Sequence, residues 1–172
     1  MSRPRGRARA GEVELDAMDR RLVLALSRDG RRAASALAKE LGLSRQAVAE
    51  RIRDLERKGV IRGYRADVAP AALGLRVRAQ IRLTLDGTAF PRKEKEVLRL
   101  LAGNPMVRSV CRVSGEDCFV AQVVCRQIED VNALLTELQA TRALQSSRTA
   151  FVLETVLEKG ALGPVEGALV AE

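Results

Sequence analysis

The side chains best suited to chemistry in this sequence are cationic, and they gather in one short segment. Guanidinium groups bind phosphates, and Arg and Gln can each make paired hydrogen bonds to the edge of a guanine or an adenine. The segment that follows Ser44 therefore favours contact with a nucleic acid. Its polar side chains at helical spacing are Arg45, Gln46, Glu50, Arg51 and Arg53.

Other chemistries are excluded by what the chain lacks. It contains no histidine, which rules out His-based triads, His-metal sites and imidazole acid–base catalysis. It has one Tyr, three Phe and no Trp, too few rings for RNA recognition by base stacking. We expect no cofactor and no metal, although three thiolates on one metal are an alternative to buried strand cysteines. The cysteines are Cys111, Cys118 and Cys125.

The charge of the chain is divided unevenly along its length. Residues 1–65 hold 17 Lys and Arg against 9 Asp and Glu, a net charge of +8, whereas residues 66–172 hold 13 of each. This asymmetry favours a polyanion-binding module joined to a neutral domain, with solubility as the simpler alternative. There is no long apolar stretch, no signal sequence and no C-x-x-C pair, so we expect a cytoplasmic protein without a membrane partner.

Three short helices are predicted around the basic segment. Apolar side chains recur at helical spacing over residues 15–26 and predict the first helix. Ser35 is expected to cap the second helix, over residues 36–41, and Gly42 to supply the left-handed turn after it. Ser44 is expected to cap the third helix, which runs to about residue 58.

Two helices joined by a Gly turn, the second of them polar and basic, form the outline of a helix-turn-helix. Ala38, Gly42 and Val48 fall where this motif needs a small residue, a turn former and a packing aliphatic. Residues 60–64 are expected to add a short strand and turn, the wing of a winged helix. With the local charge, the pattern predicts binding of double-stranded DNA; the alternative is a three-helix bundle without a ligand.

From residue 75 the apolar period changes from helical to strand spacing. The pattern predicts a strand over 77–85, a helix over 92–101, strands over 106–113 and 118–125, a helix over 128–140 and a last strand over 148–157. The order β-α-β-β-α-β is that of the ferredoxin-like fold. We therefore expect an α+β protein, with an N-terminal winged helix-turn-helix and a C-terminal ferredoxin-like domain.

In that fold the helices cover one face of the sheet and leave the other open. The open face is expected to mix polar and aliphatic side chains, a composition that favours a partner. We expect two copies of the sheet to pack back to back, which makes the chain a homodimer. The side chains expected there are Gln80, Arg82, Thr84, Val110, Val120, Val124 and Val152.

Several motifs together resemble the Lrp/AsnC family of feast/famine transcriptional regulators. They are L-D-x-x-D at residues 15–19, G-L-S at 42–44, R-I-x-x-L-E-x-x-G-V-I at 51–61, VSGEDCFV at 113–120 and SRTAFVLETVLE at 147–158. The resemblance covers about residues 15–158 in family order.

The resemblance implies a DNA-binding homodimer that assembles into higher homo-oligomers such as octamers. It also implies a small effector, usually an amino acid, bound where C-terminal domains meet. Residues 35–41 become the support helix and 44–57 the recognition helix. Within them, Arg51 and Arg53 are the expected phosphate contacts, and the alternative for each residue is a solvated helix side chain. The other implied DNA-binding residues are Ser35, Ser44, Arg45, Gln46 and Glu50.

The expected effector turn departs from the family pattern. Relatives commonly carry Gly-Asp-x-Asp there, whereas this chain reads Gly115-Glu116-Asp117-Cys118. Glu116 keeps the first carboxylate, Cys118 replaces the second, and Asp117 would point to the opposite face of a strand. A carboxylate here can receive the ammonium group of an amino acid, and turn N–H groups can hold its carboxylate. The alternative is an ordinary hairpin turn.

Two other classes of function are weighed against a sequence-specific regulator. Sirohaem decarboxylases resemble the same architecture but depend on histidines, so we expect no enzyme. An effector-independent architectural DNA-binding protein is the alternative function, favoured by the arginines at positions 3, 5, 7 and 9. The expected domains are a basic disordered arm (1–14), the winged helix-turn-helix (15–66), a linker (67–75), the effector-sensing and oligomerisation domain (76–158) and a mobile tail (159–172).

Overall fold

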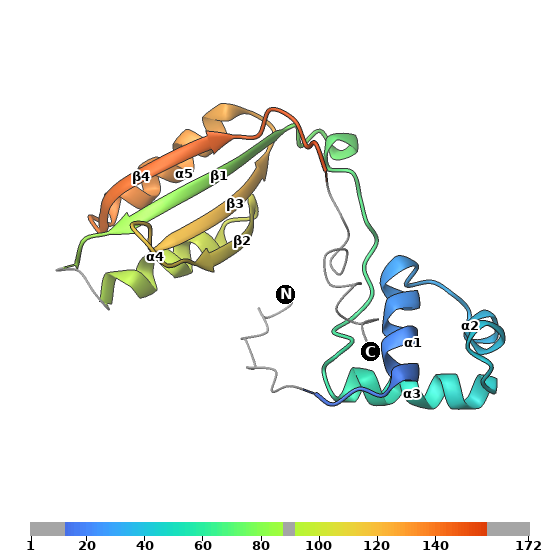
Figure 1. Cartoon of the computed structure of the whole chain (residues 1–172). Helices are drawn as coiled ribbons and strands as arrows, with labels where there is room; N and C mark the ends of the chain where they lie inside the picture. The colour runs from blue at the N-terminus through green and yellow to red at the C-terminus, as the bar shows by residue number, and fades with distance from the viewer. Residues whose placement is uncertain (1–12, 88–91, 158–172) are drawn as a thin grey trace. The chain divides into compact units, whose positions relative to one another are not determined.

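The computed structural model describes residues 13–87 and 92–157 (Figure 1). The chain divides into two compact units that separate between Ala66 and Asp67, and each unit has its own hydrophobic core. Most of the expected basic arm and all of the expected C-terminal tail lie outside the described residues. None of the helices in the described ranges is long and apolar enough to cross a membrane.

The N-terminal unit is built from α1 (Ala17–Arg28), α2 (Ala34–Leu41) and α3 (Arg45–Arg57). The apolar stripes of the three helices meet in one core, in which Leu22, Leu37, Val48 and Leu55 are fully buried. The helical periodicity in the sequence is therefore confirmed for all three elements, because each stripe faces the other two helices.

Local capping chemistry sets the helix boundaries. Ser44 accepts a hydrogen bond from the Ala47 N–H at 3.1 Å and caps α3, as the sequence predicts. Gly42 adopts the left-handed conformation, with φ of 68°, and turns the chain between α2 and α3. The expected cap of α2 is wrong: Ala33 occupies the cap position, without a side-chain hydrogen bond, and Ser35 lies inside the first turn.

The expected wing is also wrong. Residues 60–64 form no strand in the structure. Instead, the N–H groups of Val60 and Ile61 both donate to the carbonyl of Leu55, at 2.9 and 3.1 Å, and close the end of α3. Ile61 packs against the core and Tyr64 donates to Glu56 at 3.1 Å. The hydrophobic run that resembles a strand in the sequence therefore closes the C-terminal end of α3 instead.

The C-terminal unit follows the expected order of strands and helices. It contains β1 (Val77–Leu85), α4 (Arg92–Gly103), β2 (Val107–Arg112), β3 (Phe119–Cys125), α5 (Ile128–Ala140) and β4 (Leu144–Phe151), and a 3₁₀ turn, Pro70–Leu73, precedes β1. The four strands form one antiparallel sheet in the order β2-β3-β1-β4. Figure 1 shows α4 and α5 on the same side of this sheet, so the ferredoxin-like arrangement is confirmed.

The last strand lies earlier in the sequence than predicted. It begins at Leu144 rather than at residue 148, because Leu144 to Ser147 pair with Leu85 to Leu83. Polar residues are tolerated here, since β4 is an edge strand. The ladder ends with Val152, whose N–H donates to Arg78 at 2.8 Å, because β1 itself starts at Val77.

The two faces of the sheet divide polar from apolar side chains. On β1 the covered side carries Ala79, Ile81 and Leu83, all nearly fully buried. The expected open face needs two corrections. Val110 packs against the core, because a register shift between Val107 and Ser109 places it opposite Ala121. Val152 lies beyond the end of β4. The open-face residues that keep their expected alternation are Gln80, Arg82, Thr84, Val120 and Val124.

Candidate nucleic-acid interface and acidic turn

Helix α3 separates its apolar and polar residues by face. Val48 and Leu55 are fully buried on the side that packs against the other helices. The opposite side is exposed and carries polar side chains at helical spacing. These are Gln46, Glu50, Arg53 and Arg57, with Arg45 exposed at the start of the helix. This face can present hydrogen-bond donors and positive charge to a ligand.

Acidic neighbours neutralise some of the cations on α3 and leave others free. Arg57 and Lys58 both pair with Asp54, the latter at 2.7 Å. Hydrogen bonds from Lys58 and then Arg57 lower the pKa of Asp54 and keep it ionised. Arg45 and Arg53, by contrast, have no carboxylate within ion-pair distance in the part of the chain that the structure describes. Gln46 donates to Glu50 at 3.3 Å on the same face.

Arg51 lies on a different side of the helix. Its Nη1 donates to Asp16 at 2.6 Å and to Asp19 at 2.7 Å, both on α1 or at its cap. These bonds raise the pKa of Arg51. Asp16 also caps α1 by accepting from the N–H of Asp19 at 2.7 Å, and this backbone bond, followed by the bond from Arg51, lowers the pKa of Asp16. The expected phosphate contact is therefore engaged within the protein.

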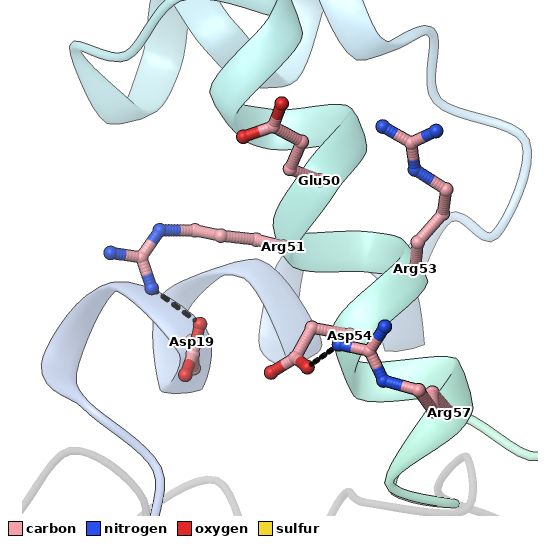
Figure 2. Close-up of a pocket in the computed structure, with 6 residues that line it drawn as sticks. All are labelled: Asp19, Glu50, Arg51, Arg53, Asp54 and Arg57. Carbon is pink, nitrogen blue, oxygen red and sulfur yellow. Dashed lines mark hydrogen bonds and ion pairs between the residues drawn. The ribbon is translucent and has the colours of Figure 1, made fainter.

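An open depression on this unit brings the charged groups of α1 and α3 together (Figure 2). Arg51 extends from α3 toward Asp19, whereas Arg53 and Arg57 extend from the other side of the helix. Its six lining residues are Asp19, Glu50, Arg51, Arg53, Asp54 and Arg57. Sequence reasoning missed the roles of Asp54 and of Asp16 and Asp19, although the latter two stand three residues apart in the L-D-x-x-D motif.

The two expected serines occupy different environments. The hydroxyl oxygen of Ser44 accepts the capping hydrogen bond from the Ala47 N–H at the start of α3. Ser35 is exposed on the first turn of α2, at a distance in sequence from the basic segment.

The acidic turn lies between β2 and β3 and is anchored to the sheet. Gly115 adopts φ of 109°, a conformation that side chains rarely take. Asp117, with its side chain 12% exposed, is 3.0 Å from Arg148 on β4 and 3.8 Å from Arg82 on β1. Glu116 is 87% exposed and 3.4 Å from Arg148. Both carboxylates of the turn therefore bond to Arg148, but that of Glu116 is exposed and that of Asp117 is mostly buried. The bonds to Asp117 and Glu116 raise the pKa of Arg148.

The cysteines do not form a common site. Cys118 is half-buried, donates its N–H to Leu83 at 2.8 Å and accepts from Leu85 at its sulfur. Cys125 is buried, and burial raises the pKa of its thiol, with a smaller contribution from Asp130. Cys111 is exposed on β2. Within residues 13–87 and 92–157, no three Cys, Asp or Glu side chains come together in a way that could hold a metal ion.

Comparisons with known proteins match both units. The family model of the AsnC-type helix-turn-helix domain matches residues 15–56, and the model of the Lrp/AsnC ligand binding domain matches residues 78–162. The regulator AldR of Mycolicibacterium smegmatis is 34% identical over 142 residues, which are 82% of each chain. The leucine-responsive regulatory protein of Rhizobium meliloti is 34% identical over 145 residues, 84% of this chain and 92% of that one.

Solved structures of other proteins are similar to this chain. AsnC of E. coli superposes with a TM-score of 0.77 at 28% identity, covering 86% of this chain and 97% of that one. A transcriptional regulator of Neisseria meningitidis, solved as a complex with L-Met, gives a TM-score of 0.80 at 21% identity, covering 88% of this chain and 99% of that one. The latter match supports the fold alone.

Proposed function

Because the chain belongs to the Lrp/AsnC family of transcriptional regulators, we propose that it recognises particular double-stranded DNA sequences and responds to a small effector. Its relatives are regulators rather than enzymes, and so is this chain. One observation carries the proposal: a capped, exposed helix presents Arg45 and Arg53 without carboxylate partners among the described residues. Positive charge that is left free on a recognition helix is available to a polyanion.

Each residue on this surface has a role that its chemistry supports. Arg45, Gln46 and Glu50 face outward near the start of α3, where recognition helices contact base edges. Arg53 is one or two turns further along and suits a phosphate, and the hydroxyls of Ser44 and Ser35 are donors of the kind that phosphates accept. Base contacts would supply sequence preference, and phosphate contacts would supply affinity.

The effector is proposed to be an amino acid held by the acidic turn. Glu116 is the exposed carboxylate there and can receive an ammonium group, while turn N–H groups beside Gly115 can hold a carboxylate. Asp117 and Cys118 shape the turn through Arg148 and the backbone of β1. The name of the Rhizobium meliloti relative supports an amino acid in this family.

The assembly is proposed to be a homodimer through the open sheet face, with higher homo-oligomers such as an octamer built from it. The face mixes Gln80, Arg82 and Thr84 with Val120 and Val124, a composition that suits a protein partner. The effector would bind where C-terminal units of the assembly meet. We propose that the protein is located in the cytoplasm, where it binds DNA.

A footprint on the upstream region of its own gene tests the proposal, with and without a pool of amino acids. Protection at helical-turn spacing that changes with the pool is the expected result, and dividing the pool would then identify the effector. Protection that ignores the pool would favour the architectural alternative, which the arginines at 3, 5, 7 and 9 also favour. A small ratio of the affinity for the upstream DNA to the affinity for mixed-sequence DNA would also favour the architectural alternative.

A further inference from the structure

We infer that Arg51 is a positioning residue, which fixes the recognition helix by tying it to the N-terminus of α1, and that it does not contact DNA. The inference rests on the proposed DNA-binding role of α3 and replaces the expectation of a phosphate contact at this position. Its partners are Asp16 and Asp19, 35 and 32 residues away in the sequence.

Helical geometry places Arg51 away from the exposed face of α3. Arg51 lies three residues after Val48 and four before Leu55, both fully buried. At 3.6 residues per turn, that spacing puts Arg51 at the edge of the buried stripe. Arg53 is two residues further and therefore points to a very different side, as Figure 2 shows. A groove that receives Arg53 would not receive Arg51.

Electrostatics hold Arg51 where it is. Its side chain is 33% exposed, and the carboxylate of Asp19 is only 13% exposed. Nη1 of Arg51 makes both bonds and holds the guanidinium against α1, beside two negative charges that repel a phosphate. To reach a phosphate on the exposed face of α3, Arg51 would have to swing away from these carboxylates, which would leave Asp19 unpaired in a partly buried site. Breaking such a pair is costly, because the remaining charge loses its partner without regaining full solvation.

Arg51, Asp16 and Asp19 together form a clamp between α3 and α1. This clamp orients α3 in a way that the hydrophobic core does not. Burial of apolar side chains such as Val48 and Leu55 is non-directional and tolerates small rotations of a helix. Hydrogen bonds from one guanidinium nitrogen to two carboxylates are directional. Asp16 is itself fixed as the cap of α1. The clamp therefore fixes the rotation of α3, and with it the direction in which Arg45 and Gln46 point.

Two variants with the same change of charge give opposite predictions. Asp19→Asn and Asp54→Asn each remove one negative charge from the DNA-binding unit, so general electrostatics predicts tighter DNA binding for both. Asp54→Asn should indeed bind more tightly, because it releases Arg57 and Lys58. Asp19→Asn should bind the footprinted duplex more weakly, by about tenfold, the effect of losing one good base contact.

A second pair separates positioning from phosphate contact. Arg53→Met should lower the slope of log K against log salt concentration by about one, as loss of a phosphate contact does. Arg51→Met should weaken binding to the footprinted duplex without changing this slope. Arg51→Lys, which keeps a cation within reach of the carboxylates, should restore most of the lost affinity. Circular dichroism at the assay temperature confirms that each variant is folded.

Two results would overturn the inference. A slope that falls by about one in Arg51→Met would make Arg51 a phosphate contact. If folded Asp19→Asn protein bound the footprinted duplex as tightly as the original chain does, the bond between Arg51 and Asp19 would be a structural ion pair without a role in DNA binding. Failure of the proposed function looks different, because the unaltered chain would then bind neither the upstream DNA nor a mixed-sequence duplex, and the inference would fall with it.

Discussion

At the scale of single residues, aspartates decide which cations of α3 can act on a ligand. Asp54 engages Arg57 and Lys58, while Asp16 and Asp19 engage Arg51. A guanidinium that already has a carboxylate gains less from a phosphate than one that is solvated, because its charge is partly compensated and the carboxylate repels the phosphate. Charge counted along the sequence therefore overstates the charge available to DNA.

The clamp makes the stability of the DNA-binding unit depend on pH in a defined direction. The folded protein lowers the pKa of Asp16 through the bonds from the Asp19 N–H and from Arg51. A carboxyl group whose pKa is lowered by folding stabilises the folded state when the pH is above the ordinary pKa. That stabilisation is lost as the pH falls through the lowered pKa of the folded protein. The thermal midpoint of the original chain should therefore exceed that of Asp16→Asn at neutral pH, with a gap that narrows in acid. Parallel curves of midpoint against pH would contradict this.

In the acidic turn, the two carboxylates should differ in their effects. Glu116→Ala should abolish the response of the footprint to amino acids and leave the homodimer intact in sedimentation, because the Glu116 side chain is exposed whereas that of Asp117 is mostly buried. The matched control is Glu137→Ala, which removes an exposed carboxylate from α5. A retained response in Glu116→Ala would move the effector site elsewhere.

At the scale of elements, the turn before α3 determines how the recognition helix begins. Gly42 has φ of 68°, and a Cβ there would meet no atom within 4 Å, so the cost of a side chain is conformational rather than steric. Gly42→Ala should lower the free energy of unfolding by about 1 kcal/mol, the cost of a left-handed residue. Gly103→Ala, at the end of α4 with ordinary backbone and open space, should change it little. Chemical denaturation measures the free energy of unfolding of both variants. Equal losses of this free energy in Gly42→Ala and Gly103→Ala would contradict a special conformational role for Gly42.

The cap of α3 can be tested in the same way. Ser44→Ala removes the acceptor for the Ala47 N–H and should cost about 1 kcal/mol of unfolding free energy. Ser35→Ala should be close to neutral, because Ser35 caps no helix in the structure. A larger loss for Ser35 than for Ser44 would reverse this assignment of the caps.

In the molecule as a whole, the excess charge and the match to a ligand binding domain lie in different parts of the chain. The excess of positive charge lies in residues 1–65, whereas the C-terminal part is neutral. Deleting residues 2–9 should reduce DNA affinity much more at low salt than at high salt, since exposed charge is screened. Replacing the arginines at 3, 5, 7 and 9 by lysine keeps the charge and should preserve most of the affinity. Equal losses at both salt concentrations would show that the arm is not an electrostatic contact.

Elements whose signal is local can be predicted from the amino-acid sequence alone. The alternation over residues 77–85 and the helical spacing over 128–140 predict β1 and α5 with their observed bounds, because burial of one face imposes the period. The motif at residues 42–61 likewise predicts the recognition helix, its cap and the family.

Features that depend on partners distant in the sequence become visible only in the folded chain. The polar start of β4 is a strand because Leu85 and Leu83 lie beside it, and residues 60–64 are not a strand because none of the described residues pairs with them. In the same way, Arg51 looks like Arg53 in the sequence, and only the folded chain brings Asp16 and Asp19 to it. A side chain's availability depends on which charges surround it in space, and that is fixed only when α1 packs against α3.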